Sequence, residues 1–479
     1  MTHLPVLAVV LPLLCAFCLP LVQALSNRAR RLSVVLFATA QVGILLLLIP
    51  RVVAEGLVEY RLGGWGPEVG IVLVVDGFSL VFALLAAVGI WMVCLYSLEY
   101  VDRRETGYFV LLFIVLAGVT GMMLTGDLFN LYVFFELAAM ASFPLIAFAR
   151  GRGAVEAAFR YMLYSTVASV MILLAIGLIY GATGALNLQQ AAAGLRGADA
   201  GLRAVILGLL TAGFAVKIAL VPFHAWLPEA YASAPSPVSA LLSGVLGKTG
   251  IYALVRLLVT FGPDTQFARL DLVLLYLGTL SVVVGHCLAF GQDSFKKVLA
   301  YSSIAHVGII MIGVGLGTAH GLAAALFHTI NHMFMKTTAF LAVGQLDTGR
   351  GFGMVAMRGA GWQAPLATTA LIVSALSLIG VPPLAGFVGK WEVTVGALRE
   401  EHLLPVAAIA FGTLLAVVYY GRMVRSLLSK PPASDVPEHP AGLFTRLVLL
   451  TGIAGCLIPF VFWGRLIAIL MHVAEMIRG

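Results

Sequence analysis

The sequence predicts an all-α polytopic membrane protein with about fourteen transmembrane helices. Of its 479 residues, 61% are hydrophobic and only 11% are charged. Apolar stretches of about 20 residues, the length that spans a bilayer, recur along the whole chain. Basic residues gather in every second loop, as they do in multi-pass proteins. Soluble globular domains carry about 25% charged residues, so this composition excludes a soluble protein.

A scan with a window of about 19 residues locates the spans. Their approximate limits are 4–24, 32–52, 72–96, 107–125, 128–149, 161–181, 203–223, 237–261, 270–290, 298–317, 320–345, 366–397, 403–424 and 445–471. Helix 7 runs into a proline-rich break at Pro222, and helix 12 is interrupted by glycine and proline at 380–383. Broken helices at membrane depth face protein or a water-filled cavity. We therefore expect both breaks to line a polar interior.

The distribution of arginine and lysine predicts the orientation of the chain. The first apolar stretch, residues 2–24, is followed by Arg28, Arg30 and Arg31, the reverse of a cleavable signal peptide, and is interpreted as helix 1. Sixteen basic residues lie in loops after odd-numbered spans and seven in loops after even-numbered spans. The positive-inside rule then places both termini on the outer side of the cell (inner) membrane. The same rule explains the net charge of +7 without nucleic-acid binding.

Four of the seven lysines lie inside predicted spans, namely Lys217, Lys248, Lys336 and Lys390. A lysine at the bilayer centre costs about 2.5 kcal/mol or more, so its amine must be paired, hydrated or used. Lys217 and Lys248 flank the break of helix 7, and Lys390 follows the break of helix 12. Because the two breaks lie five spans apart, an odd offset, they also suggest two inverted structural repeats. The pattern indicates an ion path through the membrane.

Glu136 is the acidic residue deepest in helix 5, within NLYVFFELAAMASFPL. A carboxylate and an amine in hydrocarbon should seek each other, so we expect Glu136 to approach Lys217. Two interpretations stay open for this pair. It is either a static ion pair that holds helices 5 and 7 together, or a working part of the ion path.

His328, His332 and Lys336 are spaced by four residues and share one face of helix 11. Two histidines at this spacing could bind zinc, but no glutamate follows the first histidine and a lysine one turn away repels a cation. Histidine titrates near neutral pH, which favours a proton relay. The alternative is a polar seam of hydrogen bonds between helices.

No cofactor or metal site is expected. Cys15 and Cys18 form a CxxC motif without a second pair, on a membrane helix, and the five cysteines lie in apolar stretches where they pack as small apolar residues. The sequence has no glycine-rich nucleotide loop and no Ser-His-Asp arrangement. It therefore predicts no redox or hydrolytic chemistry in this chain.

Five segments, occurring in the same order as in a known family, carry a resemblance over nearly the whole chain. They are GDLFNLYVFFEL, KIALVPFHAWLPEAYASAPSPVSALLSGVLGKTGIYALVR, KKVLAYSSIAHVG, HTINHMFMK and GVPPLAGFVGKWEV. The chain resembles the antiporter-like subunits of complex I and of Mrp-type cation/proton antiporters. The resemblance implies fourteen helices organised as 1–106 (helices 1–3), 107–262 (helices 4–8, first inverted repeat), 263–424 (helices 9–13, second inverted repeat) and 425–479 (cytoplasmic loop and helix 14).

The resemblance also implies a proton path. Its residues would be Glu136, Lys217, Lys248, His328, His332, Lys336 and Lys390. A lysine at the last position, with the wording FNLYVFFE, is most similar to the Mrp D-type protein and its relatives in membrane-bound hydrogenases, whereas the middle antiporter-like protein of complex I usually has glutamate there.

We therefore expect a proton-translocating subunit of a multi-subunit membrane complex, most similar to the D-type component of an Mrp-type sodium/proton antiporter. Its expected partners are other membrane subunits, protons, sodium and the lipid bilayer. A subunit of a membrane-bound hydrogenase or of complex I, an oxidoreductase, is the first alternative. A stand-alone carrier of small molecules and a structural scaffold with static ion pairs are the more distant ones.

Overall fold

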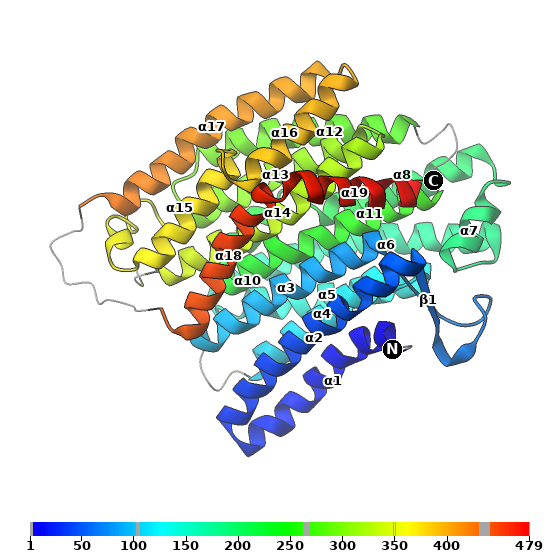
Figure 1. The fold of residues 1–479 in the computed structure, drawn as a ribbon, viewed down its shortest axis with the longest axis horizontal. Helices are drawn as coiled ribbons and strands as arrows, with labels where there is room; N and C mark the ends of the chain where they lie inside the picture. The colour runs from blue at the N-terminus through cyan, green and yellow to red at the C-terminus, as the bar shows by residue number, and fades with distance from the viewer. Residues whose placement is uncertain are drawn as a thin grey trace.

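The computed structural model describes residues 3–101, 106–261, 268–347, 349, 351–430 and 441–478. Helices run side by side across the molecule in one bundle (Figure 1). The first nine helices are α1 (Leu4–Leu25), α2 (Asn27–Glu55), α3 (Gly77–Tyr100), α4 (Thr106–Leu124), α5 (Leu128–Ala147), α6 (Arg152–Thr183), α7 (Leu188–Leu195), α8 (Ala200–Lys217) and α9 (Leu227–Ser233). The others are α10 (Ser236–Leu241), α11 (Gly247–Phe261), α12 (Ala268–Phe290), α13 (Phe295–Gly315), α14 (Ala319–Gln345), α15 (Pro365–Ile379), α16 (Ala385–Arg399), α17 (Leu403–Leu428), α18 (Leu443–Val461) and α19 (Trp463–Arg478).

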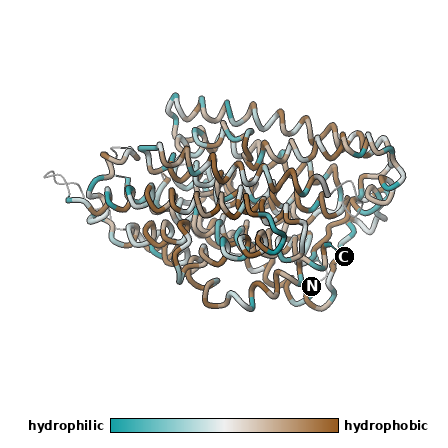
Figure 2. Tube along the Cα trace, turned by 90° about the horizontal axis from the view of Figure 1, so that it is seen from above, coloured by the Kyte–Doolittle hydropathy of each residue, from teal (hydrophilic) through white to brown (hydrophobic). Residues whose placement is uncertain are grey.

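Twelve helical segments of the described residues are long and apolar enough to cross a membrane. One of them combines α10, a π-helical turn at Leu242–Leu246 and α11. Adding α14, which carries polar residues, and the broken pair α15 and α16 completes the fourteen predicted spans. Apolar residues colour most of the helix lengths in Figure 2, and hydrophilic residues gather toward the two ends of the bundle. The predicted polytopic helical fold is confirmed.

A small β-hairpin departs from the all-α prediction. Strands β1 (Leu57–Arg61) and β2 (Val72–Asp76) pair antiparallel between α2 and α3. The valine-rich β2 favours a strand, and the glycines and proline of the intervening segment favour a turn. Asp76 then caps α3, because its carboxylate accepts the backbone N–H of Ser79 at 2.8 Å.

Both predicted helix breaks are confirmed, and the first begins earlier than expected. Helix α8 ends at Lys217 itself, and residues 218–226 are not helical. The indole of Trp226 donates to the freed carbonyl of Val216 at 2.9 Å. In the second break α15 ends at Ile379, and Gly380 takes a φ of +90°, which glycine adopts without a steric penalty.

The last predicted span, 445–471, is wrong as one continuous helix. Helix α18 ends at Val461, and α19 begins at Trp463 and packs mainly against α14. Both chain ends lie on the right-hand side of Figure 1, which is also the side of β1 and α7. An even number of crossings requires the termini to share a side.

The predicted boundary between residues 262 and 263 lies outside the described residues. The other two boundaries fall within two elements: α4 begins at Thr106, just before the expected start at 107, and α17 runs to Leu428, past the expected end at 424. The division into inverted repeats stays a prediction.

Candidate functional site

Helix α14 lies at the centre of the bundle and contacts α13, α15, α16, α18 and α19. Its polar side chains His328, His332 and Lys336 are consequently buried, each at most 1% exposed. The expected face of three titratable groups is therefore present, and it points into protein. A buried histidine or lysine needs hydrogen-bond partners from neighbouring helices or from water.

His306 on α13 joins this face, although the sequence patterns did not single it out. Its ring stacks against those of His328 and His332, with ring centroids 5.2 Å apart in each pair. His306 Nδ1 lies 3.0 Å from His328 Nε2. Three parallel imidazoles from two helices thus form one cluster. In the sequence, this role could have been inferred from the position of His306 within the apolar helix that contains KKVLAYSSIAHVG.

Lys248 reaches α13 through the π-helical turn that precedes it. Its ammonium donates to the backbone carbonyl of Ser243, which lies inside the turn at Leu242–Leu246. The Ser243 hydroxyl lies 3.0 Å from the Ser303 hydroxyl on α13. Single π-turns inside α-helices occur frequently at functional sites. Here the turn links the lysine of one helix to the polar face of another.

Lys336 continues the same polar contact network. Its ammonium donates to the Leu299 carbonyl at 2.8 Å and to the Ser302 hydroxyl. The Ser303 hydroxyl donates to the same Leu299 carbonyl at 2.8 Å, and Ser302 pairs with the Tyr420 hydroxyl of α17 at 2.8 Å. Polar contacts therefore connect Lys248 to Lys336 by way of α13.

Lys390 lies on α16, directly after the second helix break. Its ammonium donates to the Ile379 carbonyl at 3.0 Å and to the Thr413 hydroxyl at 3.3 Å. Ile379 is the last residue of α15, so the break supplies this acceptor. The neighbouring Gly389 packs its Cα against the ring of His328, where a Cβ would not fit. The break and this close approach place Lys390 beside the histidine cluster.

His286 on α12 extends the polar groups toward α17. Its Nδ1 lies 3.0 Å from the Tyr419 hydroxyl, and its ring centroid is 6.3 Å from that of His306. Tyr419 in turn packs against Tyr420, with ring centroids 4.6 Å apart. His286 is a second buried histidine that the sequence patterns did not select.

The expected Glu136–Lys217 ion pair is not formed among the described residues. The Lys217 ammonium instead donates to the hydroxyls of Tyr161 and Ser165 on α6, at 2.9 Å and 3.1 Å. It also lies over the ring of Phe135, 4.8 Å from the centroid. Glu136 is only half-buried on α5, and its Oε1 has no hydrogen-bond partner among these residues. Hydroxyl groups on α6 therefore satisfy the amine. The prediction considered only acidic partners for Lys217 and so missed them.

Several buried polar atoms of the cluster lack a hydrogen-bond partner within the described chain. They include both ring nitrogens of His332, Nε2 of His306, Nδ1 of His328 and Oδ1 of Asn331. Buried polar groups in native proteins are bonded to protein or to ordered water in about 90% of cases or more. We therefore expect water beside the imidazoles.

Two other features bear on the site. Asp127 caps α5, accepting the Asn130 backbone N–H at 2.7 Å, and burial raises the pKa of this carboxyl. Within the described ranges, no group of three or more His, Cys, Asp or Glu side chains is arranged to hold a metal ion. Imidazole, amine and hydroxyl groups are the donors and acceptors that this cluster offers.

Comparisons with known proteins agree on one family. Residues 125–416 match the family described as NADH:quinone oxidoreductase/Mrp antiporter, TM. The chain is 34% identical to the N component of NADH-quinone oxidoreductase from Desulforudis audaxviator, over 96% of its own length and 94% of the relative. It is 30% identical to the D component of the Na(+)/H(+) antiporter from Bacillus subtilis, over 95% of its own length and 94% of the relative.

A solved structure gives the same answer for the fold. A chain of the membrane-bound sulfane sulfur reductase, an archaeal respiratory membrane complex, superposes with a TM-score of 0.93 and 30% identity, over 99% of this chain and 98% of that one. The similarity covers the segments on which the buried lysines and histidines lie. This chain belongs to the NADH:quinone oxidoreductase/Mrp antiporter transmembrane family.

Proposed function

We propose that this chain moves protons across the membrane along its buried lysine and histidine side chains. One observation carries the proposal: polar contacts run almost without interruption from Lys248 through α13 to Lys336, and the imidazole cluster lies between them and Lys390. Charged groups at this depth are costly, and those that membrane proteins retain commonly mark ion paths and proton relays. A static scaffold needs no such succession of titratable groups.

We call Lys248, Lys336, Lys390 and the histidines between them the row. Each group of the row can hold and release a proton. Burial and a cationic neighbour favour the neutral form of lysine, so a buried amine can lose its proton and regain it. Imidazole exchanges protons through either ring nitrogen. His306, with Nδ1 3.0 Å from Nε2 of His328, supplies a direct hydrogen-bonded step between two helices. Water at the unpartnered nitrogens of His332 would complete the connection.

Glu136 and Lys217 would couple this row to a neighbouring subunit. Glu136 is half-buried, on a helix whose exposed side also bears Phe129, Val133 and Met140. A charge arriving beside Glu136 would change the electrostatic environment of Lys217, and Lys217 would shift the affinity of the next lysine for its proton. This coupling acts through the electrostatic field of the two charges and needs no direct ion pair between Glu136 and Lys217.

The host that we propose first is a multi-subunit Mrp-type sodium/proton antiporter, with this chain as its D-type component. The lysine at position 390 and the similarity to an antiporter D component over nearly the full chain support it. An ion-translocating redox complex is the second candidate. The 34% identity to the oxidoreductase N component is higher than the 30% identity to the antiporter D component, and a chain of a respiratory complex superposes with a TM-score of 0.93. The termini would face the outer side in either host.

Proton flux into membrane vesicles, normalised to the amount of assembled complex, tests the proposed function. We expect Lys248→Ala and Lys390→Ala to assemble and to lose most of the flux. Lys297→Ala is the matched control, because this lysine pairs with Glu229 at 2.8 Å and is about one-third exposed. Retention of wild-type flux in both row variants would refute the proposal.

Copurification in mild detergent decides between the hosts. Antiporter proteins recovered with this chain would support the Mrp assignment, and flux should then depend on a sodium gradient. Redox proteins recovered with it would assign it to the respiratory class instead. The proton row itself is compatible with both outcomes.

A further inference from the structure

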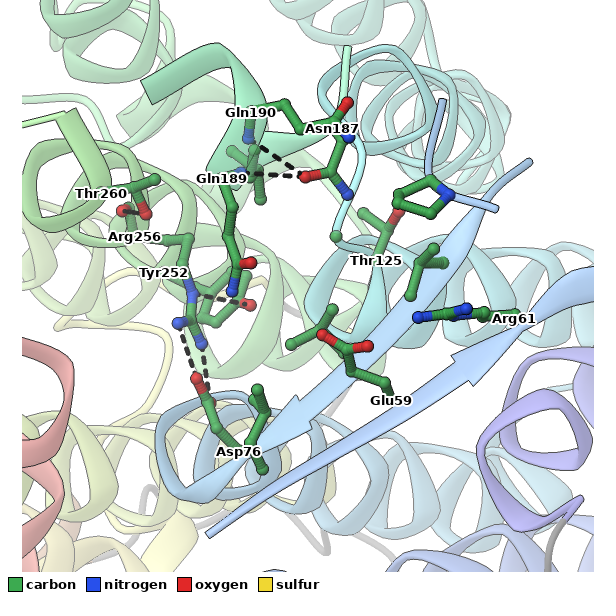
Figure 3. A pocket seen from close by; sticks show the side chains of 16 residues that line it. Glu59, Arg61, Asp76, Thr125, Asn187, Gln189, Gln190, Tyr252, Arg256 and Thr260 are labelled. Carbon is green, nitrogen blue, oxygen red and sulfur yellow. Dashed lines mark hydrogen bonds and ion pairs between the residues drawn. The ribbon is translucent and has the colours of Figure 1, made fainter. Parts of the chain in front are cut away.

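A polar pocket lies beside the β-hairpin. Strand β1 and helix α7, which border it, are on the side of the molecule that holds both chain ends (Figure 1). Its volume is about 300 Å³, and β1, β2, α7 and the end of α11 contribute to its wall. Figure 3 shows the charged and amide side chains of the wall gathered around one space. Glu59, Asp76, Gln189, Tyr252 and Arg256 are among them. None of these five is among the expected proton-path residues, which are Glu136, Lys217, Lys248, His328, His332, Lys336 and Lys390.

The inner wall of this pocket is a buried ion pair. Arg256 donates from both terminal nitrogens to the two Asp76 carboxylate oxygens, each at 2.7 Å. The two side chains are 15% and 12% exposed. Burial would raise the pKa of the Asp76 carboxyl, but the adjacent guanidinium holds it below its ordinary value. Asp76 therefore stays ionised while the pair is closed.

Helix α11 connects the ion pair to the row. Lys248, Tyr252 and Arg256 follow one another at intervals of four residues and so share a helix face. The Arg256 Nε donates to the Tyr252 hydroxyl at 3.3 Å, and that hydroxyl donates to the Met123 carbonyl at 2.7 Å. At 1.5 Å per residue, the backbone from Lys248 to Arg256 spans about 12 Å. Tyr252, which lines the pocket, lies one helical turn from Lys248 on this face.

We propose that this pocket is the water-filled mouth through which the proton on Lys248 exchanges with the solution on the hairpin side, and that the Asp76–Arg256 ion pair is its gate. The inference rests on the proposed function, since it supplies one end of the same row. For this exchange the Lys248 ammonium leaves the Ser243 carbonyl and gives a proton to the Tyr252 hydroxyl oxygen, while the hydroxyl leaves the Met123 carbonyl and gives its own proton to pocket water. Tyr252 ends unchanged, and Lys248 ends neutral. Arg256 keeps its proton throughout.

The alternative is a purely structural role, in which the ion pair clamps the hairpin to α11. The Arg256 guanidinium also lies over the ring of Phe78, 5.0 Å from its centroid, and Phe78 stacks on Tyr252 at 5.1 Å. Such a clamp would explain the ion pair. It needs neither the Tyr252 hydroxyl nor an open pocket lined by Glu59 and Gln189. The two interpretations therefore differ in what chemical blockage of the pocket does.

The first experiment blocks the pocket in the assembled complex. Gln189→Cys places a thiol on its exposed wall, in a background where Cys18 and Cys287, the two native thiols that are not buried, become serine. A membrane-impermeant cationic methanethiosulfonate is added from the hairpin side. We expect labelling to reduce proton flux several-fold relative to the same variant before labelling. Arg196→Cys, on the same side but outside the pocket wall, should label without this loss.

The second experiment removes only the phenol oxygen. Tyr252→Phe keeps the stack with Phe78, and Tyr108→Phe is the control, since that buried hydroxyl pairs with Ser97 at 3.0 Å, away from the pocket. We expect Tyr252→Phe to assemble and to lose flux several-fold. If Lys248→Ala abolishes flux while labelling at 189 and Tyr252→Phe both leave it intact, the row stands and the pocket is a clamp. If Lys248→Ala itself keeps full flux, the proposed function fails first.

Discussion

His306 Nδ1 lies 3.0 Å from His328 Nε2, in a hydrogen bond between α13 and α14. The His306 ring also stacks on His332, with centroids 5.2 Å apart. Because His328 and His332 are themselves 6.4 Å apart, His306 is the group that contacts both. A proton that moves between His328 and His332 would therefore be transferred by way of His306.

The first prediction concerns His306. A positioned acid–base group contributes about a hundredfold or more to a proton transfer, so we expect His306→Ala to lower flux at least about tenfold. His306→Gln, which keeps a hydrogen-bonding side chain and does not titrate, should fail similarly. The measurement is vesicle proton flux per assembled complex. Full activity of the glutamine variant would mean that His306 only holds α13 and α14 together.

The second prediction concerns His332, both of whose ring nitrogens lack a partner among the described residues. We expect His332→Ala to impair transport more than assembly, because it removes a titratable imidazole from the cluster without breaking a hydrogen bond to another described residue. His320→Ala is the control: His320 lies on the same helix and contacts Glu392 at 3.6 Å, away from the cluster. Loss of assembled complex with unchanged flux per remaining molecule would favour a polar seam between helices.

The third prediction separates a relay from a scaffold at Lys217. Arginine keeps the positive charge and the N–H groups that can donate to the Tyr161 and Ser165 hydroxyls, but it does not deprotonate in proteins. We therefore expect Lys217→Arg to assemble normally and to transport poorly, as Lys217→Ala does. The assay is proton or cation flux at equal amounts of complex. Near-wild-type flux in the arginine variant would leave Lys217 a structural residue.

The fourth prediction concerns Glu136, which forms no ion pair with Lys217 in the described chain. Glu136→Gln preserves shape and removes the charge, so we expect normal assembly with loss of coupling between flux and its driving gradient. Glu156→Gln is a suitable control, because that carboxylate forms an exposed pair with Arg160 at 2.7 Å. A collapse of assembly in Glu136→Gln alone would show that the carboxylate serves an interface and not the row.

The fifth prediction tests the close packing that sets Lys390 beside the histidines. A Cβ at position 389 would run into the His328 ring, and overpacking of this kind costs about 1–3 kcal/mol. We expect Gly389→Ala to lower both the melting temperature of the complex and its flux. At Gly208 of α8 a Cβ meets nothing within 4 Å, so Gly208→Ala should be neutral or slightly stabilising. Equal behaviour of the two alanine variants would contradict the packing argument.

Much of the fold follows from the order of residues alone. Long apolar stretches predict the spans, because the bilayer excludes an unpaired backbone over about 20 residues. Proline and glycine act within one helical turn, so the breaks near Pro222 and Gly380 are local properties that a sequence displays. The four-residue spacing of His328, His332 and Lys336 is local in the same sense. The four lysines within spans are conspicuous because each is costly there.

Contacts between distant segments were decided only by the tertiary structure. The packing of α13 on α14 inserts His306 into the cluster, and α6 brings the hydroxyls of Tyr161 and Ser165 to Lys217. Glu136 was the expected partner because opposite charges attract, but attraction acts only between groups that the helices bring together. The Asp76–Arg256 pair joins residues 180 positions apart. Such pairings depend on how helices rotate and cross, which hydrophobic periodicity does not specify when nearly every face of a helix is apolar.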